Sequence, residues 1–225
     1  MPRKTQFTAD EIVEAAVDLV KENGWDGLSV KAVAQKIGSS TMPVYSHFDN
    51  LEKLKDAVVV KGWDTLMEYE GKHYTGDAWV DQSIGYIRFA TDETKLFHCM
   101  FDGRNLELQR QRGFKNWIYL LKLLKNYEGF EGLEAEQIFL TRYSRAVYTH
   151  GLAASVTARL WGKLLDVDGM IENLVVAGSH AILEGYRKTY DCENETFAFL
   201  DKEIKRTIEL GKIKLRQEED GRQIE

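Results

Sequence analysis

The most informative stretch of this sequence runs from residue 28 to residue 48 and reads LSVKAVAQKIGSSTMPVYSHF. Ser29 can cap a short helix at its N-terminus, and Gly38 can end that helix after about two turns. Pro43 lacks an N–H group and is tolerated only in a first turn, so a second helix should begin around Ser40 or Thr41. The buried face of the earlier helix is predicted to be apolar residues at helical spacing, namely Val30, Val33, Ala34 and Ile37.

Two short helices joined by about three residues are typical of a DNA-reading helix-turn-helix. Hydroxyl and imidazole groups crowd the second helix, where they can hydrogen-bond phosphates and base edges, and its positive end favours anions without Lys or Arg. Tyr45 has a second interpretation, in which its ring covers the core while its hydroxyl stays in water. We expect base-edge contacts from Thr41, Met42 and Ser46, contacts with thymine methyl groups from Met42 and Pro43, and phosphate contacts from Lys36, Ser40, Tyr45 and His47.

The sequence on either side predicts further helices. Thr8 and Glu11 form a capping box at the start of a helix that Gly24 ends, and Phe7 can pack onto Ile12. Downstream, Asn50 can cap a fourth helix whose inward residues are Leu51, Leu54, Val58, Leu66 and Tyr69.

Proline usage indicates the fold class of the rest. Only Pro2 and Pro43 occur in 225 residues, which favours long helices, and no sustained period-two pattern suggests strands. The prediction is an all-α protein. Further helices are expected near 78–91, 93–102, 105–127, 134–161, 168–189 and 194–217. The expected domains are 1–50, a helix-turn-helix domain, 51–217, a larger helical domain, and 218–225, a disordered tail.

Charge and composition limit the class of protein. Lys and Arg number 30 against 36 Asp and Glu, a net charge of −6, so DNA contact must be local and a polybasic membrane anchor is excluded. No apolar stretch follows the first charged residues, and no apolar run approaches the roughly 18 residues of a membrane span. Two cysteines are too few for a disulfide framework. We therefore expect a soluble, cytoplasmic protein.

A longer pattern covers residues 8–54. Its members are Thr8, Ile12, Ala15, Ala16, Leu19, Gly24, Leu28, Ser29, Val30, Val33, Ala34, Gly38, Ser40, Val44, Tyr45, His47, Phe48 and Leu54. In this pattern the segment resembles the N-terminal domain of the TetR family of bacterial transcription regulators. The resemblance implies a homodimer of all-helical subunits that binds a pseudo-palindromic DNA operator, usually a repressor released by a small effector.

Three positions depart from the family's usual pattern. Leu51 stands where a phosphate-binding Lys is usual, Pro43 where Thr or another small residue is common, and Ser39 where an aliphatic residue is usual. Residues 1–62 contain eight Lys and Arg against nine Asp and Glu. The electrostatic contribution to DNA binding should therefore be weaker than in a basic domain.

The second domain is rich in aromatic residues, since 21 of the 25 Phe, Trp and Tyr lie in 63–225. Core filling explains most of them, while some are expected to line a cavity for an apolar or aromatic effector, with Arg142, Tyr143 and His98 as polar candidates. The predicted ligand-binding residues are Trp63, Met67, Tyr86, Phe89, Phe97, His98, Met100, Phe101, Trp117, Leu121, Arg142 and Tyr143.

Small residues at helical spacing predict a close helix–helix interface in 134–161 and 168–189. Dimerisation is the favoured interpretation, and close packing within one subunit is the alternative. The predicted interface residues are Val147, Gly151, Ala154, Ala158, Leu174, Gly178, Ala181 and Gly185.

Signatures of catalysis and of metal binding are missing. The sequence contains no nucleophile-elbow, P-loop, dinucleotide-binding or zinc-protease motif. His98 and Cys99 point about 100° apart on a helix, so they rarely share a metal. We expect no enzyme activity, metal or cofactor. A helical enzyme or partner-binding module with a vestigial helix-turn-helix remains the alternative.

Overall fold

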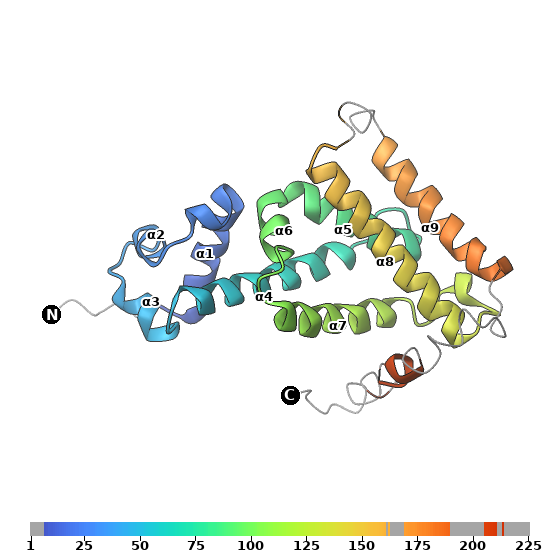
Figure 1. The fold of residues 1–225 in the computed structure, drawn as a ribbon, viewed down its shortest axis with the longest axis horizontal. Coiled ribbons are helices and arrows are strands. Elements are labelled where there is room, and N and C mark those ends of the chain that lie inside the picture. Colours follow the sequence, from blue (N-terminus) through green and yellow to red (C-terminus); the bar gives the residue numbers. More distant parts are fainter. Residues whose placement is uncertain (1–6, 161, 163–168, 190–204, 211–212, 214–225) are drawn as a thin grey trace. The chain divides into compact units, whose positions relative to one another are not determined.

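The computed structural model describes residues 7–160, 162, 169–189, 205–210 and 213, and over these residues it contains helices and no strand (Figure 1). The predicted all-α fold class is thereby confirmed. Within the described part of the chain, no helix combines the length and the apolar character needed to cross a membrane. The predicted tail lies outside the described residues, as does most of the predicted helix 194–217, of which 205–210 is helical.

The helices follow the predicted order. They are α1 (Ala9–Asn23), α2 (Val30–Lys36), α3 (Met42–His47), α4 (Leu51–Glu70), α5 (Ala78–Asp92), α6 (Thr94–Met100), α7 (Leu106–Leu123), α8 (Ala135–Thr157) and α9 (Met170–Thr189), with 3-10 turns η1 (Gly24–Gly27) and η2 (Glu128–Phe130). The single helix predicted over 105–127 was too long, since α7 ends at Leu123. The Leu124 and Lys125 N–H groups then donate three residues back, which tightens the chain into a turn.

The predicted capping residues are confirmed. Thr8 Oγ1 accepts from the Glu11 N–H at 3.2 Å, and a Glu11 carboxylate oxygen accepts from the Thr8 N–H at 2.8 Å. Gly24 ends α1 with φ of +65°. The side chains of Ser29 and Asn50 each accept from a main-chain N–H three residues further on, at the starts of α2 and α4.

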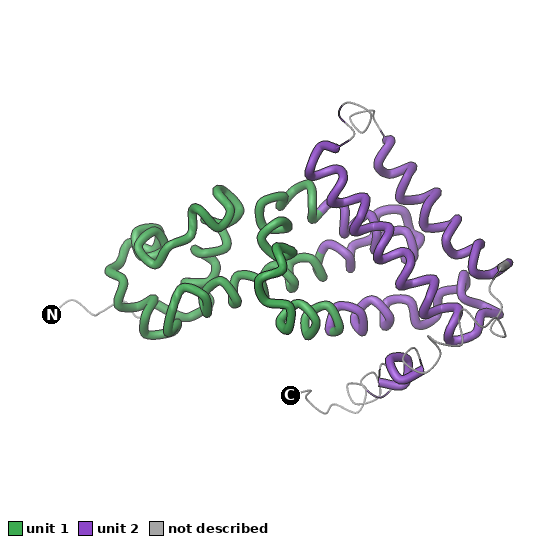
Figure 2. The backbone as a smooth tube through the Cα atoms, in the orientation of Figure 1, with its two compact units in different colours: residues 1–68, 89–114 green, residues 69–88, 115–225 purple. Residues whose placement is uncertain are grey.

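The chain divides into two compact units (Figure 2). Unit 1 comprises residues 1–68 and 89–114, and unit 2 comprises residues 69–88 and 115–225. This division differs from the predicted boundary at residue 50. Most of α4, all of α6 and half of α7 group with the helix-turn-helix.

Long-range contacts in unit 1 explain this difference. α6 packs on α1, where Lys21 Nζ lies 2.7 Å from a carboxylate oxygen of Glu93. Trp25 Nε1 donates to Asp102 at 2.7 Å. These pairs join residues more than seventy positions apart, so the first three helices do not complete their own core. Buried side chains of unit 1 include Ile12, Ala16, Val20, Val33, Val44, Leu54, Leu96 and Met100.

In unit 2, α8 packs along α9 (Figure 1). A Cβ atom at Gly178 would collide with the Tyr148 ring, and the Tyr148 hydroxyl donates to the carbonyl of Leu174 at 2.8 Å. Trp79, on α5, is fully buried and donates through Nε1 to the carbonyl of Ser179 at 2.9 Å. Unit 2 therefore has a core of its own, built on α5, α8 and α9.

Candidate functional site

The turn between α2 and α3 sets the direction of α3. Gly38 has φ of +68°, a conformation that residues with a side chain rarely adopt. The following N–H group, of Ser39, donates to the carbonyl of Ala34 at 2.9 Å. No atom lies within 4 Å of the position that a Cβ on Gly38 would take. Glycine is therefore required here for backbone conformation and not for close packing.

α3 has a buried side and an exposed side. The Val44 side chain is 1% exposed, whereas Met42 is 73% exposed and Tyr45 is 54% exposed. Ser40 and Ser46 are exposed too. The exposed side thus presents a methionine, a phenol and hydroxyl groups together, which can make apolar contacts with thymine methyl groups and hydrogen bonds with phosphates or base edges.

Local hydrogen bonds define what two of these hydroxyls can do. Ser46 Oγ donates to the carbonyl of Pro43 at 2.6 Å, so its oxygen is left to accept, for example from an adenine or cytosine amino group. Thr41 occupies the N-cap position of α3 but makes no side-chain capping bond. Its hydroxyl can therefore both donate and accept.

His47 has a structural contact that the sequence did not indicate. Its Nε2 lies 2.9 Å from the carbonyl oxygen of Phe7, which only accepts, so Nε2 is the donor. The bond links the C-terminal end of α3 to the residue before the Thr8 cap. Contact between His47 and a phosphate remains a prediction, and it requires the imidazolium form, because Nδ1 of the neutral ring is an acceptor when Nε2 carries the proton.

The charges near α3 are partly neutralised. Lys36 Nζ lies 3.4 Å from carboxylate oxygens of both Asp18 and Glu22 on α1. At the start of α4, Leu51 supplies no cation and Glu52 adds a negative charge to the first turn. Glu52 is itself paired with Lys55 at 2.8 Å, and Lys53 is exposed, so the predicted phosphate contacts combine neutral donors with few free cations.

Seven of the predicted ligand-binding residues fall in unit 1, where several of them form a tightly packed apolar core. Trp63 donates through Nε1 to Gln109 at 3.1 Å, and its ring lies edge-on to Phe101 with centroids 5.5 Å apart. A Cβ at Gly62 would meet the sulfur of Met100. The unit 1 members are Trp63, Met67, Phe89, Phe97, His98, Met100 and Phe101, of which His98 is exposed.

The other five lie in unit 2, namely Tyr86, Trp117, Leu121, Arg142 and Tyr143. Arg142 is 3% exposed, its guanidinium lies 3.9 Å from the Trp117 ring centroid, and it donates through Nη2 to the Trp117 carbonyl at 2.7 Å. Tyr143 is largely exposed and stacks on Phe139. The structure therefore divides the predicted ligand set between the two units, and His98 does not share a unit with Arg142.

A second buried arginine lies one turn along α8. Arg145 donates to the carbonyl of Trp79 and, at 2.5 Å, to Gln82 Oε1, while its guanidinium lies 3.8 Å from the Trp79 ring centroid. Gln82 in turn donates to the carbonyl of Leu120 at 3.1 Å. We call Glu70, Gln82, Asn116, Arg142 and Arg145 the interior polar cluster. Of these five, the sequence indicated only Arg142.

Glu70 is the carboxyl group of this cluster. It is buried and accepts from Asn116 Nδ2 at 2.9 Å. Burial raises its pKa to about 8, and the hydrogen bond from Asn116 and the charge of Arg145 offset only part of that effect. The carboxyl is therefore mostly protonated at neutral pH. Hydropathy alone could not reveal the burial of Glu70, because a glutamate at the last position of a helix is ordinarily exposed.

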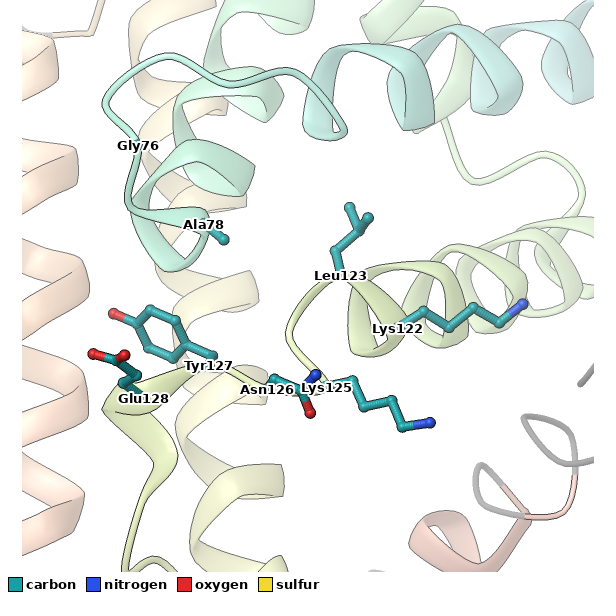
Figure 3. A pocket seen from close by; sticks show the side chains of 8 residues that line it. All are labelled: Gly76, Ala78, Lys122, Leu123, Lys125, Asn126, Tyr127 and Glu128. Atoms are coloured by element: carbon teal, nitrogen blue, oxygen red, sulfur yellow. The ribbon is translucent and has the colours of Figure 1, made fainter.

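An open groove of about 380 Å³ lies elsewhere in unit 2 (Figure 3). Lys122, Lys125 and Tyr127 project around it, and none of the predicted ligand residues lines it. Its complete lining is Gly76, Ala78, Lys122, Leu123, Lys125, Asn126, Tyr127 and Glu128.

The predicted dimer residues lie on α8, on α9 and just after α8. Val147, Gly151, Leu174, Ala181 and Gly185 are exposed in the single chain, as is Ala158, whereas Ala154 is half-buried. Gly178 packs against Tyr148 of its own chain. At this position the alternative interpretation, close packing within one subunit, therefore holds. Dimerisation through the exposed members stays a prediction.

No group of three or more metal-ligating side chains occurs among the described residues. Cys99 is buried, and burial raises its pKa to about 11, so its thiol carries little nucleophilic thiolate at neutral pH. The expectation that His98 and Cys99 bind no metal stays a prediction.

Comparisons with known proteins point to the N-terminal helices. Residues 12–58 match the model of the bacterial regulatory proteins of the TetR family. The uncharacterized HTH-type transcriptional regulator Rv0681 of Mycobacterium tuberculosis is 32% identical over 65 residues, 29% of this chain and 30% of that protein. The tetracycline repressor protein class D of Escherichia coli is 36% identical over 56 residues, 25% of this chain and 26% of that protein.

The matches to these relatives thus span less than a third of their length. Over most of the chain the similarity is one of fold. A solved structure of a protein of unknown function from Rhodococcus sp. RHA1 superimposes with a TM-score of 0.59 at 16% identity, covering 82% of this chain and 98% of that one. The pattern of residues 12–58 and the helix-turn-helix that they build thus match the N-terminal segment of the TetR family of bacterial regulatory proteins.

Proposed function

We propose that this protein is a sequence-specific DNA-binding transcription regulator in which α3 is the recognition helix. The observation that carries the proposal is the exposed side of α3, where Met42 and Tyr45 project beside Ser40 and Ser46 while Val44 anchors the helix in the core. Because the methionine and the phenol leave most of their surface exposed, their position fits contact with a groove and its phosphates.

The proposed active form is a homodimer that reads a pseudo-palindromic operator. Exposed small and apolar residues along α8 and α9, such as Val147, Gly151 and Ala181, support this assembly because they allow another helix to approach closely. Two linked recognition helices bind two half-sites whose separation is a multiple of about 34 Å along DNA.

The proposed mode of regulation is repression that a small apolar or aromatic effector releases. The names of two relatives support repression, the tetracycline repressor already described and the HTH-type transcriptional repressor DrrR1 of Streptomyces coeruleorubidus, 36% identical over 56 residues. An effector acts only if it binds one dimer geometry better than the other. A shift from 99:1 to 1:99 takes about 5.5 kcal/mol of differential affinity.

A mobility-shift titration on the DNA upstream of the protein's own gene tests the proposal. We expect a specific complex whose affinity falls as salt rises, with a shallow slope because few cations contact phosphates. Tyr45→Phe should weaken the complex, and the matched variant Tyr119→Phe, in unit 2, should not. Equal binding to unrelated DNA by all three proteins would contradict sequence-specific regulation and favour a module whose helix-turn-helix is vestigial.

A further inference from the structure

Among the residues that the structure describes, Arg142 is a buried cation without a counter-charge. It is 3% exposed, and the structure records one hydrogen bond for its five N–H donors, from Nη2 to the Trp117 carbonyl. Its Nε is fully enclosed and has no hydrogen-bond partner. Within the described part of the chain, no carboxylate lies within ion-pair distance of this guanidinium. A buried cation costs several kcal/mol when it is unpaired, so this arrangement calls for an explanation.

The rest of the interior polar cluster does not supply the missing anion. Of the charges in the described residues, the one that acts appreciably on Arg142 is that of Arg145, which is repulsive. Burial, and to a smaller extent that repulsion, lower the pKa of Arg142 to about 9, so it still carries its charge at neutral pH. The charge of Glu70 acts on Arg145 and raises the pKa of that arginine. The pKa of Glu70 is about 8, so this carboxyl is mostly neutral at pH 7. Glu70 and Asp77 therefore act on Arg145, and neither supplies a counter-charge to Arg142.

The surroundings of Arg142 are aromatic. Trp117 lies against its guanidinium, the Trp117 and Phe139 ring centroids are 5.4 Å apart, and Phe139 stacks on Tyr143 with centroids 6.1 Å apart. Trp117 and Phe139 are only half-buried and Tyr143 is mostly exposed, so a row of ring surfaces leads from solvent to a buried cation. Asn116, beside Trp117, adds a buried Oδ1 without a partner.

We propose that Arg142, with Trp117, Phe139 and Tyr143, binds a small aromatic carboxylate whose charged group accepts from the Arg142 guanidinium and whose ring lies against the row of aromatic side chains. A carboxylate supplies the missing counter-charge and an acceptor for Nε–H, and it matches the planar donor edge of arginine. A neutral aromatic hydrocarbon would supply neither the counter-charge nor the acceptor for Nε–H. This inference rests on the proposed effector-responsive function and narrows the chemical class of the effector.

The test uses the full-length protein without DNA and two probes of the same size, 1-naphthoate and 1-naphthalenemethanol. Calorimetry should show that the naphthoate binds at least about tenfold more tightly than the neutral alcohol. Arg142→Met should remove that preference, and Arg142→Lys, which keeps the charge but not the planar edge, should retain part of it. Lys122→Gln and Lys125→Gln, in the groove of Figure 3, should leave it unchanged.

A second readout places the probe. Bound naphthoate should quench tryptophan fluorescence, and Trp117→Phe should remove most of the quenching while leaving the affinity within a fewfold. Equal affinity for the two probes, no binding of either, or a preference lost in the lysine variants and kept in Arg142→Met would each overturn the inference. Because the mobility shift with operator DNA is measured without a probe, failure here is distinguishable from failure of the proposed DNA-binding function.

Discussion

His47 Nε2 donates a 2.9 Å hydrogen bond to the carbonyl oxygen of Phe7, which ties the end of α3 to the residue that precedes α1. The contact spans forty residues of sequence. It fixes α3, the proposed recognition helix, against the start of α1, through a side chain for which the sequence predicts phosphate binding. A residue predicted to contact DNA thus also holds α3 in place.

His47→Ala should lower the free energy of unfolding by about 0.5–1.5 kcal/mol, the usual net value of one hydrogen bond. His47→Gln should lose less, because its amide can donate to the same carbonyl. Urea denaturation followed by circular dichroism measures both. Equal losses in the two variants would mean that the hydrogen bond to Phe7 does not contribute to stability and that packing of the imidazole ring accounts for the whole loss.

Thr41→Ala and Tyr45→Phe should affect DNA binding differently. The Thr41 hydroxyl makes no capping bond in α3, so we expect it to read a base, and its loss should relax preference at one base pair by about 1–3 kcal/mol. The Tyr45 hydroxyl is expected on a phosphate, so its loss should weaken binding equally on all sequences. Competition binding with single-base operator variants separates these outcomes, and a uniform loss for Thr41→Ala would contradict base reading.

Glu70→Gln should change how stability depends on pH. The folded pKa of about 8 lies above the ordinary value of 4.5, so the native state binds the proton more tightly than the unfolded state does. This group therefore favours folding fully below pH 4.5, and its contribution is lost as the pH rises towards about 8, by up to about 1.4 kcal/mol per pH unit. Arg145 opposes this shift, and the nearby Tyr86 and Tyr119 have pKa values above their ordinary range.

The quantity to measure is the difference in unfolding free energy between Glu70→Gln and the wild type at several pH values. Relative to the wild type, the variant should become more stable as the pH rises from 4.5 to 8, and the difference should stay constant above pH 8. Parallel profiles for the two proteins would show that Glu70 titrates normally.

Gly151→Arg should disrupt the proposed dimer without disturbing the subunit. No atom lies within 4 Å of the added Cβ, and arginine is a better helix former than glycine. Sedimentation should show a shift towards monomer and the mobility shift a loss of operator affinity, since two half-sites need two linked readers. Gln111→Arg, exposed on α7, is the control. An unchanged dimer would place the interface elsewhere.

Gly85→Ala should destabilise the protein by about 1–3 kcal/mol, the usual range for overpacking. The added methyl group would collide with the main chain of Tyr69 and Glu70, which cannot move as a flexible side chain can. Gly151→Ala is the matched control, because it adds the same methyl group to an open helical position and should be neutral or slightly stabilising. Thermal unfolding of both variants gives the comparison.

The sequence by itself determined the local features of this protein. The capping box of Thr8 and Glu11, the caps at Ser29 and Asn50, and the start of α3 next to Pro43 were predicted correctly. Each depends on residues within three or four positions of one another, where hydrogen-bond geometry follows directly from residue type. The same segment also carries the pattern that matches the TetR family model.

Tertiary structure alone decided which distant residues meet. Because α6 packs on α1, unit 1 extends beyond the predicted boundary at residue 50. Gly178 packs against Tyr148 within one chain. Glu70 and Arg145 were brought together in the interior, where hydropathy places neither, because charged residues are almost never fully buried unless they are paired. Burial depends on what the rest of the chain packs against a side chain, and no local pattern encodes that.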